Sequence, residues 1–152
     1  MFEDIKKVFL ITDMDGTFLP ASKVPSRKNI EAVDRLQKDG ALFSIATGRS
    51  LQASQQYFGS FSVNAPFIMC NGGMVYDMHR KKQINDIYLP EKARSFTRSI
   101  LQANPDVGCE VLLIDGVYVP QMTPLEEEHC GICKVEPKLV DVNEKRVDWI
   151  IF

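Results

Sequence analysis

Three short apolar runs, each followed by a polar residue, constrain the fold of this 152-residue chain more than any other feature. The runs are rich in β-forming residues and have the length of buried strands, and segments with helical spacing separate them. This β-α-β-α order predicts an α/β protein whose parallel strands bring their carboxyl ends to one edge of a sheet, where ligands bind. The runs and the polar residues that follow them are 8–12 with Asp13, 41–46 with Thr47, and 66–70 with Asn71.

The remainder of the chain indicates two regions. We predict a Rossmann-like, doubly wound parallel sheet, with helices at residues 26–39 and 51–58, in the region 1–87. After Gly73 the pattern changes to short strands, a helix at 90–103 and a strand pair around the turn at 115–116, which predicts a separate α+β unit over 88–152. The apolar segment 147–152 has the pattern of a strand with no following cover, so we expect the chain to be a truncated piece of a longer protein.

Composition excludes several classes of function. With 45% hydrophobic and 25% charged residues, the chain is typical of a folded globular protein. A net charge of −2 argues against a nucleic-acid partner, and no apolar run approaches the roughly 18 residues that cross a bilayer. The amino terminus lacks the layout of a signal peptide, so we expect a cytoplasmic protein without a membrane partner.

The segment from Asp13 to Thr17, Asp-Met-Asp-Gly-Thr, carries the strongest chemical signal. Side chains two positions apart in an extended chain point to the same side, so the carboxylates of Asp13 and Asp15 can approach one reacting centre. Phosphoryl transfer needs a nucleophile, a cation and a proton donor, and an aspartate can attack phosphorus to form an aspartyl-phosphate. Two carboxylates also meet part of the oxygen coordination that Mg²⁺ requires, and Gly16 lets backbone approach a phosphate. The alternative is a pair of aspartates that only cap a turn.

Two further strand ends offer phosphate-binding groups. Thr47 and Gly48 can bind a phosphate oxygen through a hydroxyl and an amide at a helix amino terminus, whereas the alternative is a helix N-cap followed by the surface residue Arg49. Arg49 and Asn71 are possible substrate-side residues, the latter through its amide, but Asn-Gly is also a common hairpin turn.

The segment His129-Cys130-Gly131-Ile132-Cys133 contains three candidate zinc ligands. A closed structural zinc site needs four ligands at matching spacing, and the sequence offers no second Cys/His pair nearby. We therefore interpret this segment as a non-metal feature.

These motifs together resemble the haloacid dehalogenase superfamily, and specifically its Cof-type sugar-phosphate phosphatases of subfamily IIB with a C2 cap. Residues 9–19 resemble the first motif of that family, residues 46–50 the second, and residues 70–73 the turn that follows. The resemblance implies that Asp13 is the phosphorylated nucleophile and an Mg²⁺ ligand, and that Asp15 is the acid/base and gives the metal its backbone carbonyl. It also implies that Thr47 binds the transferring phosphoryl group, that 1–87 is core, and that 88–152 is the beginning of an inserted cap.

The chain departs from the family after residue 76. The family's lysine and its Gly-Asp-x-x-x-Asp-like motif, which complete the site, are not recognisable in the sequence. We expect the returning half of the core to be absent and the isolated chain to be nearly inactive.

Three functions follow from this interpretation. The first is an Mg²⁺-dependent phosphatase acting on a small phosphorylated metabolite. The second is a phosphomutase-type phosphotransferase that uses the same aspartate. The third is a non-catalytic phosphate-binding or regulatory module that lacks the rest of the site.

Overall fold

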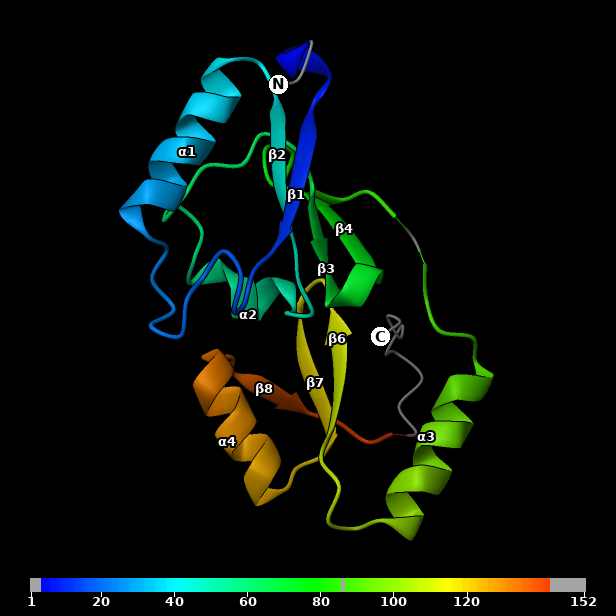
Figure 1. The fold of residues 1–152 in the computed structure, drawn as a ribbon. Helices are drawn as coiled ribbons and strands as arrows, with labels where there is room; N and C mark the ends of the chain where they lie inside the picture. Colours follow the sequence, from blue (N-terminus) through cyan, green and yellow to red (C-terminus); the bar gives the residue numbers. More distant parts are fainter. Residues whose placement is uncertain (1–3, 86, 143–152) are drawn as a thin grey trace. The chain divides into compact units, whose positions relative to one another are not determined.

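A computed structural model describes residues 4–85 and 87–142 of the chain. The chain divides into two compact units, one formed by residues 1–48 and 57–85 and the other by residues 49–56 and 86–152. Figure 1 shows the elements of both units, and each unit is described here by itself.

The first unit is built on a five-stranded sheet in the order β1-β2-β3-β4-β5. The first three strands are parallel, and the last two are antiparallel to their neighbours. The α/β class and the parallel arrangement of the first strands are therefore confirmed. The strands are β1 (Phe9–Asp13), β2 (Leu42–Ala46), β3 (Phe67–Met69), β4 (Met74–Asp77) and β5 (Lys82–Gln83).

Helix α1 (Arg27–Lys38) connects β1 to β2, as the apolar spacing predicts. It begins after Ser26, whose hydroxyl accepts a hydrogen bond from the Asn29 N–H at 3.1 Å and so satisfies one of the free amides of the first turn. Its buried residue is Val33. Two short 3₁₀ turns, η1 (Ile5–Lys7) and η2 (Cys70–Gly72), complete the elements of this unit.

The core of the first unit centres on β2. Phe43 and Ile45 are 1% and 0% exposed, and the Phe43 ring lies 5.6 Å from the ring of Phe18. The expectation that the first apolar run is a buried strand is wrong, because Phe9, Leu10 and Ile11 of β1 are 40–48% exposed. Among the described strands, β1 lies at the edge of the sheet and pairs only with β2. No described strand pairs with its other edge.

The second unit contains a three-stranded sheet, with β6 and β7 antiparallel and β8 parallel to β7. Buried side chains of β6 and β7, such as Val111 and Val119, form its core. Strand β8 and the full extent of helix α4 were not predicted from the sequence. The elements are α2 (Leu51–Gln55), α3 (Lys92–Ala103), β6 (Cys109–Leu113), β7 (Gly116–Gln121), α4 (Pro124–Cys133) and β8 (Pro137–Leu139).

The strand predicted at residues 147–152 lies outside the described residues. No helix in the described part of the chain has the length and apolar character needed to cross a membrane.

Phe43 is the side chain on which packing of the first unit should depend most. We expect Phe43→Ala to lower the free energy of unfolding by about 3–5 kcal/mol, because truncating a fully buried aromatic leaves a cavity. Phe9→Ala removes the same atoms from a side chain that is 48% exposed and should cost far less. Urea denaturation followed by circular dichroism compares the two variants, and equal losses would contradict this description of the core.

Candidate active site

The parallel register of the first unit brings three sequence-distant segments together. Asp13 at the end of β1 is paired with Ala46 of β2, and Ala46 is paired with Ile68 of β3. The residues that follow are tied by the backbone: the Thr47 N–H donates to Ile68 O at 2.9 Å, and the Asn71 N–H donates to Thr47 O at 3.2 Å. This edge encloses a cavity of about 290 Å³ lined by Asp13, Ala46, Thr47, Gly48, Ile68, Asn71 and Gly72.

The loop after β1 is a closed turn that holds the Asp13 segment in place. The Gly16 N–H donates to Leu19 O at 2.9 Å, and the Leu19 N–H donates to Met14 O at 2.7 Å. Gly16 has φ +77°, a conformation that side chains disfavour. Met14 and Leu19 are 1% and 0% exposed, so two buried apolar side chains anchor a turn that carries two carboxylates. Gly16 thus supplies the conformation of the turn, while its own N–H is engaged within it.

Asp13 has one side-chain neighbour from the same turn. The Thr17 hydroxyl lies 3.4 Å from Asp13 Oδ2, at the outer limit of a hydrogen bond. Asp13 also lines the cavity, so its carboxylate is available to a ligand there.

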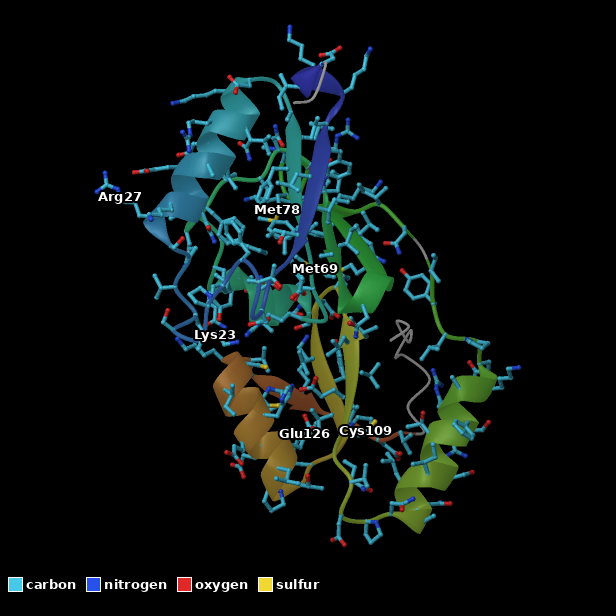
Figure 2. All side chains as sticks on the ribbon, viewed as in Figure 1. Lys23, Arg27, Met69, Met78, Cys109 and Glu126 are labelled. Carbon is cyan, nitrogen blue, oxygen red and sulfur yellow. The ribbon has the colours of Figure 1, made fainter. Side chains whose placement is uncertain are left out.

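Asp15 forms an ion pair that sequence reasoning missed. Lys23 Nζ lies 2.6 Å from Asp15 Oδ1, and the two side chains are 48% and 33% exposed. Lys23 has φ +58° and follows Pro20, whose carbonyl accepts its N–H at 2.8 Å. This tight turn directs a lysine from the same loop back to the motif. Figure 2 labels Lys23 in this loop. Only the position of Lys23 between two prolines hinted at such a turn.

Asn71 lies both in a turn and at the cavity. It lies in the turn between β3 and β4 with φ 51° and ψ 32°, the left-handed conformation that asparagine tolerates. It also lines the cavity, with its side chain against Gly48. A Cβ at Gly48 would meet Asn71 Oδ1 at 2.9 Å, so an alanine here would displace the Asn71 side chain.

The structure therefore brings Asp13, Thr47, Gly48 and Asn71 around one cavity. Asp15 and Gly16 lie in the adjoining turn and are not among the residues that line the cavity. Arg49 belongs to the second unit, where its Nη1 is 3.5 Å from Ala53 O.

The donor set at this edge fits a hard cation. Asp13 supplies a carboxylate, and the neighbouring backbone carbonyl and hydroxyl groups supply further oxygens, which is the chemistry that Mg²⁺ prefers. The side chains of the four cavity residues include no sulfur or imidazole ligand. The residues present can therefore provide part of a magnesium shell.

The contact between Gly48 and Asn71 can be tested by a double-mutant cycle. We expect Gly48→Ala to lower the free energy of unfolding by roughly 1–3 kcal/mol, because the new methyl group overpacks against the Asn71 amide. In an Asn71→Gly background, which keeps the left-handed backbone, the same change should cost much less. Gly131→Ala, in a helix with nothing within 4 Å of the new methyl, is the control. Equal costs in both backgrounds would contradict the contact.

Comparison with known proteins gives a family match over most of the chain. The family of haloacid dehalogenase-like hydrolases matches residues 10–148. This range includes the first motif, the two strand ends followed by Thr47 and Asn71, and most of the second unit.

Curated relatives align with the amino-terminal part of the chain. Pyridoxal phosphate phosphatase YbhA of Escherichia coli is 36% identical over 69 residues, covering 45% of this chain and 25% of YbhA. The 5-amino-6-(5-phospho-D-ribitylamino)uracil phosphatase YitU of Bacillus subtilis is 30% identical over 73 residues. This match covers 48% of this chain and 27% of YitU. The matches thus span about a quarter of each relative's length.

Solved structures show the same fold at lower identity. BT1666 of Bacteroides thetaiotaomicron, a phosphatase of the HAD superfamily, has a TM-score of 0.75 at 23% identity, covering 98% of this chain and 56% of its own. The HAD subclass IIB sugar phosphatase BT4131 has a TM-score of 0.76 at 18% identity. This match covers 95% of this chain and 56% of BT4131. The resemblance inferred from the motifs is confirmed: the chain belongs to the haloacid dehalogenase-like hydrolase family.

Proposed function

We propose that the protein containing this chain is a cytoplasmic, Mg²⁺-dependent phosphatase that hydrolyses small phosphate monoesters, sugar phosphates foremost, through an aspartyl-phosphate on Asp13. The observation that carries the proposal is the cavity at the strand ends, where the Asp13 carboxylate shares one wall with Thr47, Gly48 and Asn71. The relatives named as phosphatases of pyridoxal phosphate and of a phosphoribitylamino-uracil support a small phosphorylated substrate.

In the first step, an Asp13 carboxylate oxygen attacks phosphorus and the bond from phosphorus to the ester oxygen breaks. Asp15 donates a proton to that oxygen, which leaves as an alcohol. In the second step, the ionised Asp15 accepts a proton from water as the water oxygen attacks phosphorus. The acyl-phosphate bond then breaks, so Asp13 is regenerated and inorganic phosphate leaves.

The cavity residues position the phosphoryl group for both displacements. The Thr47 hydroxyl and the Asn71 amide can donate hydrogen bonds to its oxygens, and Gly48 leaves room for its backbone to approach them. Bound Mg²⁺ would neutralise part of the phosphate charge, with Asp13 and the Asp15 backbone carbonyl among its ligands. Asp13 and these donors stand on a shared sheet edge, so little reorganisation is needed when charge develops.

Lys23 is a positioning residue in this proposal. Its ammonium fixes one carboxylate oxygen of Asp15 within a loop that is otherwise held by backbone hydrogen bonds. Because both side chains are partly exposed, the pair contributes little energy and can open when substrate arrives.

The covalent step can be tested by isotope labelling. The whole protein should release phosphate from sugar phosphates with Mg²⁺, and turnover in ¹⁸O-water should place the label in phosphate rather than in Asp13, because water attacks phosphorus. Asp13→Asn should lose turnover and should accumulate no acyl-phosphate. Retained turnover in Asp13→Asn would refute the assignment, and conversion of one sugar phosphate into its isomer without phosphate release would replace hydrolysis by phosphomutase chemistry.

The role of Lys23 predicts a graded effect. We expect Lys23→Met to lower kcat by at most about fivefold, since an exposed ion pair is worth about 0–1 kcal/mol. Lys28→Met, an exposed lysine of helix α1, is the control and should leave kcat unchanged. A loss in Lys23→Met as complete as that of Asp13→Asn would show that Lys23 takes part in the chemistry instead of positioning Asp15.

A further inference from the structure

The second unit contains a cluster of metal-ligating side chains that the proposed phosphatase site does not use. One ligand atom from each of Glu110, Glu126 and Cys130 lies within 4.8 Å of the others. Cys130 Sγ is 3.7 Å from Glu110 Oε1 and 3.7 Å from Glu126 Oε1. His129 Nε2 lies 3.8 Å from the same Glu110 oxygen. Figure 2 labels Glu126 on α4.

Helix geometry explains why three of these residues face one strand. In α4, His129 and Cys130 follow Glu126 by three and four positions, a spacing that places each of them beside Glu126 on one face of the helix. Glu110 approaches this face from β6. Two neighbouring elements therefore contribute to the cluster, which makes it independent of a single turn or loop.

One backbone feature brings the start of β6 close to α4 at this point. A Cβ added at Gly108, the residue before β6, would meet the Glu126 side chain at 2.6–2.8 Å. The pairing of β6 with β7 shifts register between Cys109 and Val111, where Glu110 is the single β6 residue opposite two residues of β7. The position of the Glu110 and Glu126 carboxylates thus follows from the fold itself.

The ordinary explanation for Glu126 is a helix cap. Thr123 and Glu126 have the spacing of a capping box, and the Thr123 hydroxyl accepts the Glu126 N–H at 3.2 Å. In a complete box the glutamate carboxylate would bond back to the Thr123 N–H. Among the hydrogen bonds of the described residues, the Glu126 carboxylate is instead directed to Cys130. Capping therefore accounts for the Glu126 backbone but not for its carboxylate.

Burial and neighbouring carboxylates shift the pKa values of two groups in the cluster. Burial, and then the hydrogen bond and charge of Glu126, raise the pKa of Glu110 to about 7. Burial and the two carboxylates raise the pKa of the Cys130 thiol to about 12. Among the described residues, the ion pairs include no lysine or arginine partner for Glu110 or Glu126. A divalent cation would relieve the repulsion and favour the thiolate.

We propose that Glu110, Glu126 and Cys130 form a Zn²⁺ site that fastens helix α4 to strand β6. His129 is its fourth ligand once its ring turns away from Cys133 Sγ, which lies 3.5 Å from His129 Nε2. Zinc bonds of about 2.1 Å to oxygen and about 2.3 Å to sulfur, at a tetrahedral angle, place the two ligand atoms about 3.6 Å apart. The two sulfur–oxygen distances of 3.7 Å match this spacing. A thiolate and an imidazole beside carboxylates select zinc or cobalt over Mg²⁺ and Ca²⁺. The site is separate from the phosphatase proposal and does not depend on it.

Cobalt substitution tests the proposal directly, because a Co²⁺–thiolate bond gives a charge-transfer band in the near ultraviolet. The 152-residue chain, freed of metal by a chelator, should develop this band with one equivalent of Co²⁺, and Zn²⁺ should abolish it by displacement. Cys130→Ser should lose the band. Glu110→Gln and Glu126→Gln should weaken binding at least about tenfold. The band should persist in Asp13→Asn, since the core aspartates provide no thiolate.

Matched variants separate ligation from nonspecific charge. Glu127→Gln and Glu128→Gln change exposed carboxylates of the same helix and should leave affinity unchanged, as should Cys109→Ser on β6. Zn²⁺ should raise the Tm of the parent chain but not of Glu126→Gln, an isosteric change that keeps the helix intact. Absence of the band, or its retention in Cys130→Ser, would overturn the proposal, as would equal zinc stabilisation of the parent and Glu126→Gln.

Discussion

The parallel pairing of β1 with β2 and of β2 with β3 is the constraint on which the candidate active site depends. Pairing of Asp13 with Ala46, and of Ala46 with Ile68, fixes where each strand stops, and the next polar residues emerge at one edge. A shift of one residue in either ladder would turn every side chain of that strand to the opposite face. Because Phe43 and Ile45 must stay buried, their packing indirectly fixes the position of the Asp13 carboxylate relative to Thr47.

Charge imposes a second constraint on the same edge. The motif carries two aspartates two residues apart, and a lysine of the same turn, Lys23, pairs with Asp15. Buried Met14 and Leu19 keep the turn rigid while Lys23 remains exposed enough to move. At the candidate site, buried apolar side chains and backbone hydrogen bonds therefore hold the turn, while the ion pair beside it is partly exposed.

The sequence predicted the features that follow from local pattern. Apolar runs located β1, β2 and β3, and the position of Asp13, Thr47 and Asn71 after them predicted a shared edge. Burial of β1 was predicted wrongly, because an apolar run does not reveal whether a strand has a neighbour on each side. Lys23 was missed since its contact depends on a turn conformation, and β8 was missed because its parallel pairing with β7 is non-local and short.

The cluster in the second unit shows the same limit more sharply. The His129-to-Cys133 segment favoured a non-metal interpretation because the sequence offered no fourth ligand at a recognisable spacing. Glu110 lies sixteen residues before Glu126, on a different element, and Gly108 beside it permits the close approach to α4. The two candidate cation sites also differ in chemistry: oxygen donors at the strand ends suit Mg²⁺, while sulfur and nitrogen beside carboxylates suit zinc. If both proposals hold, this difference in ligand chemistry would separate the two metals between the two units.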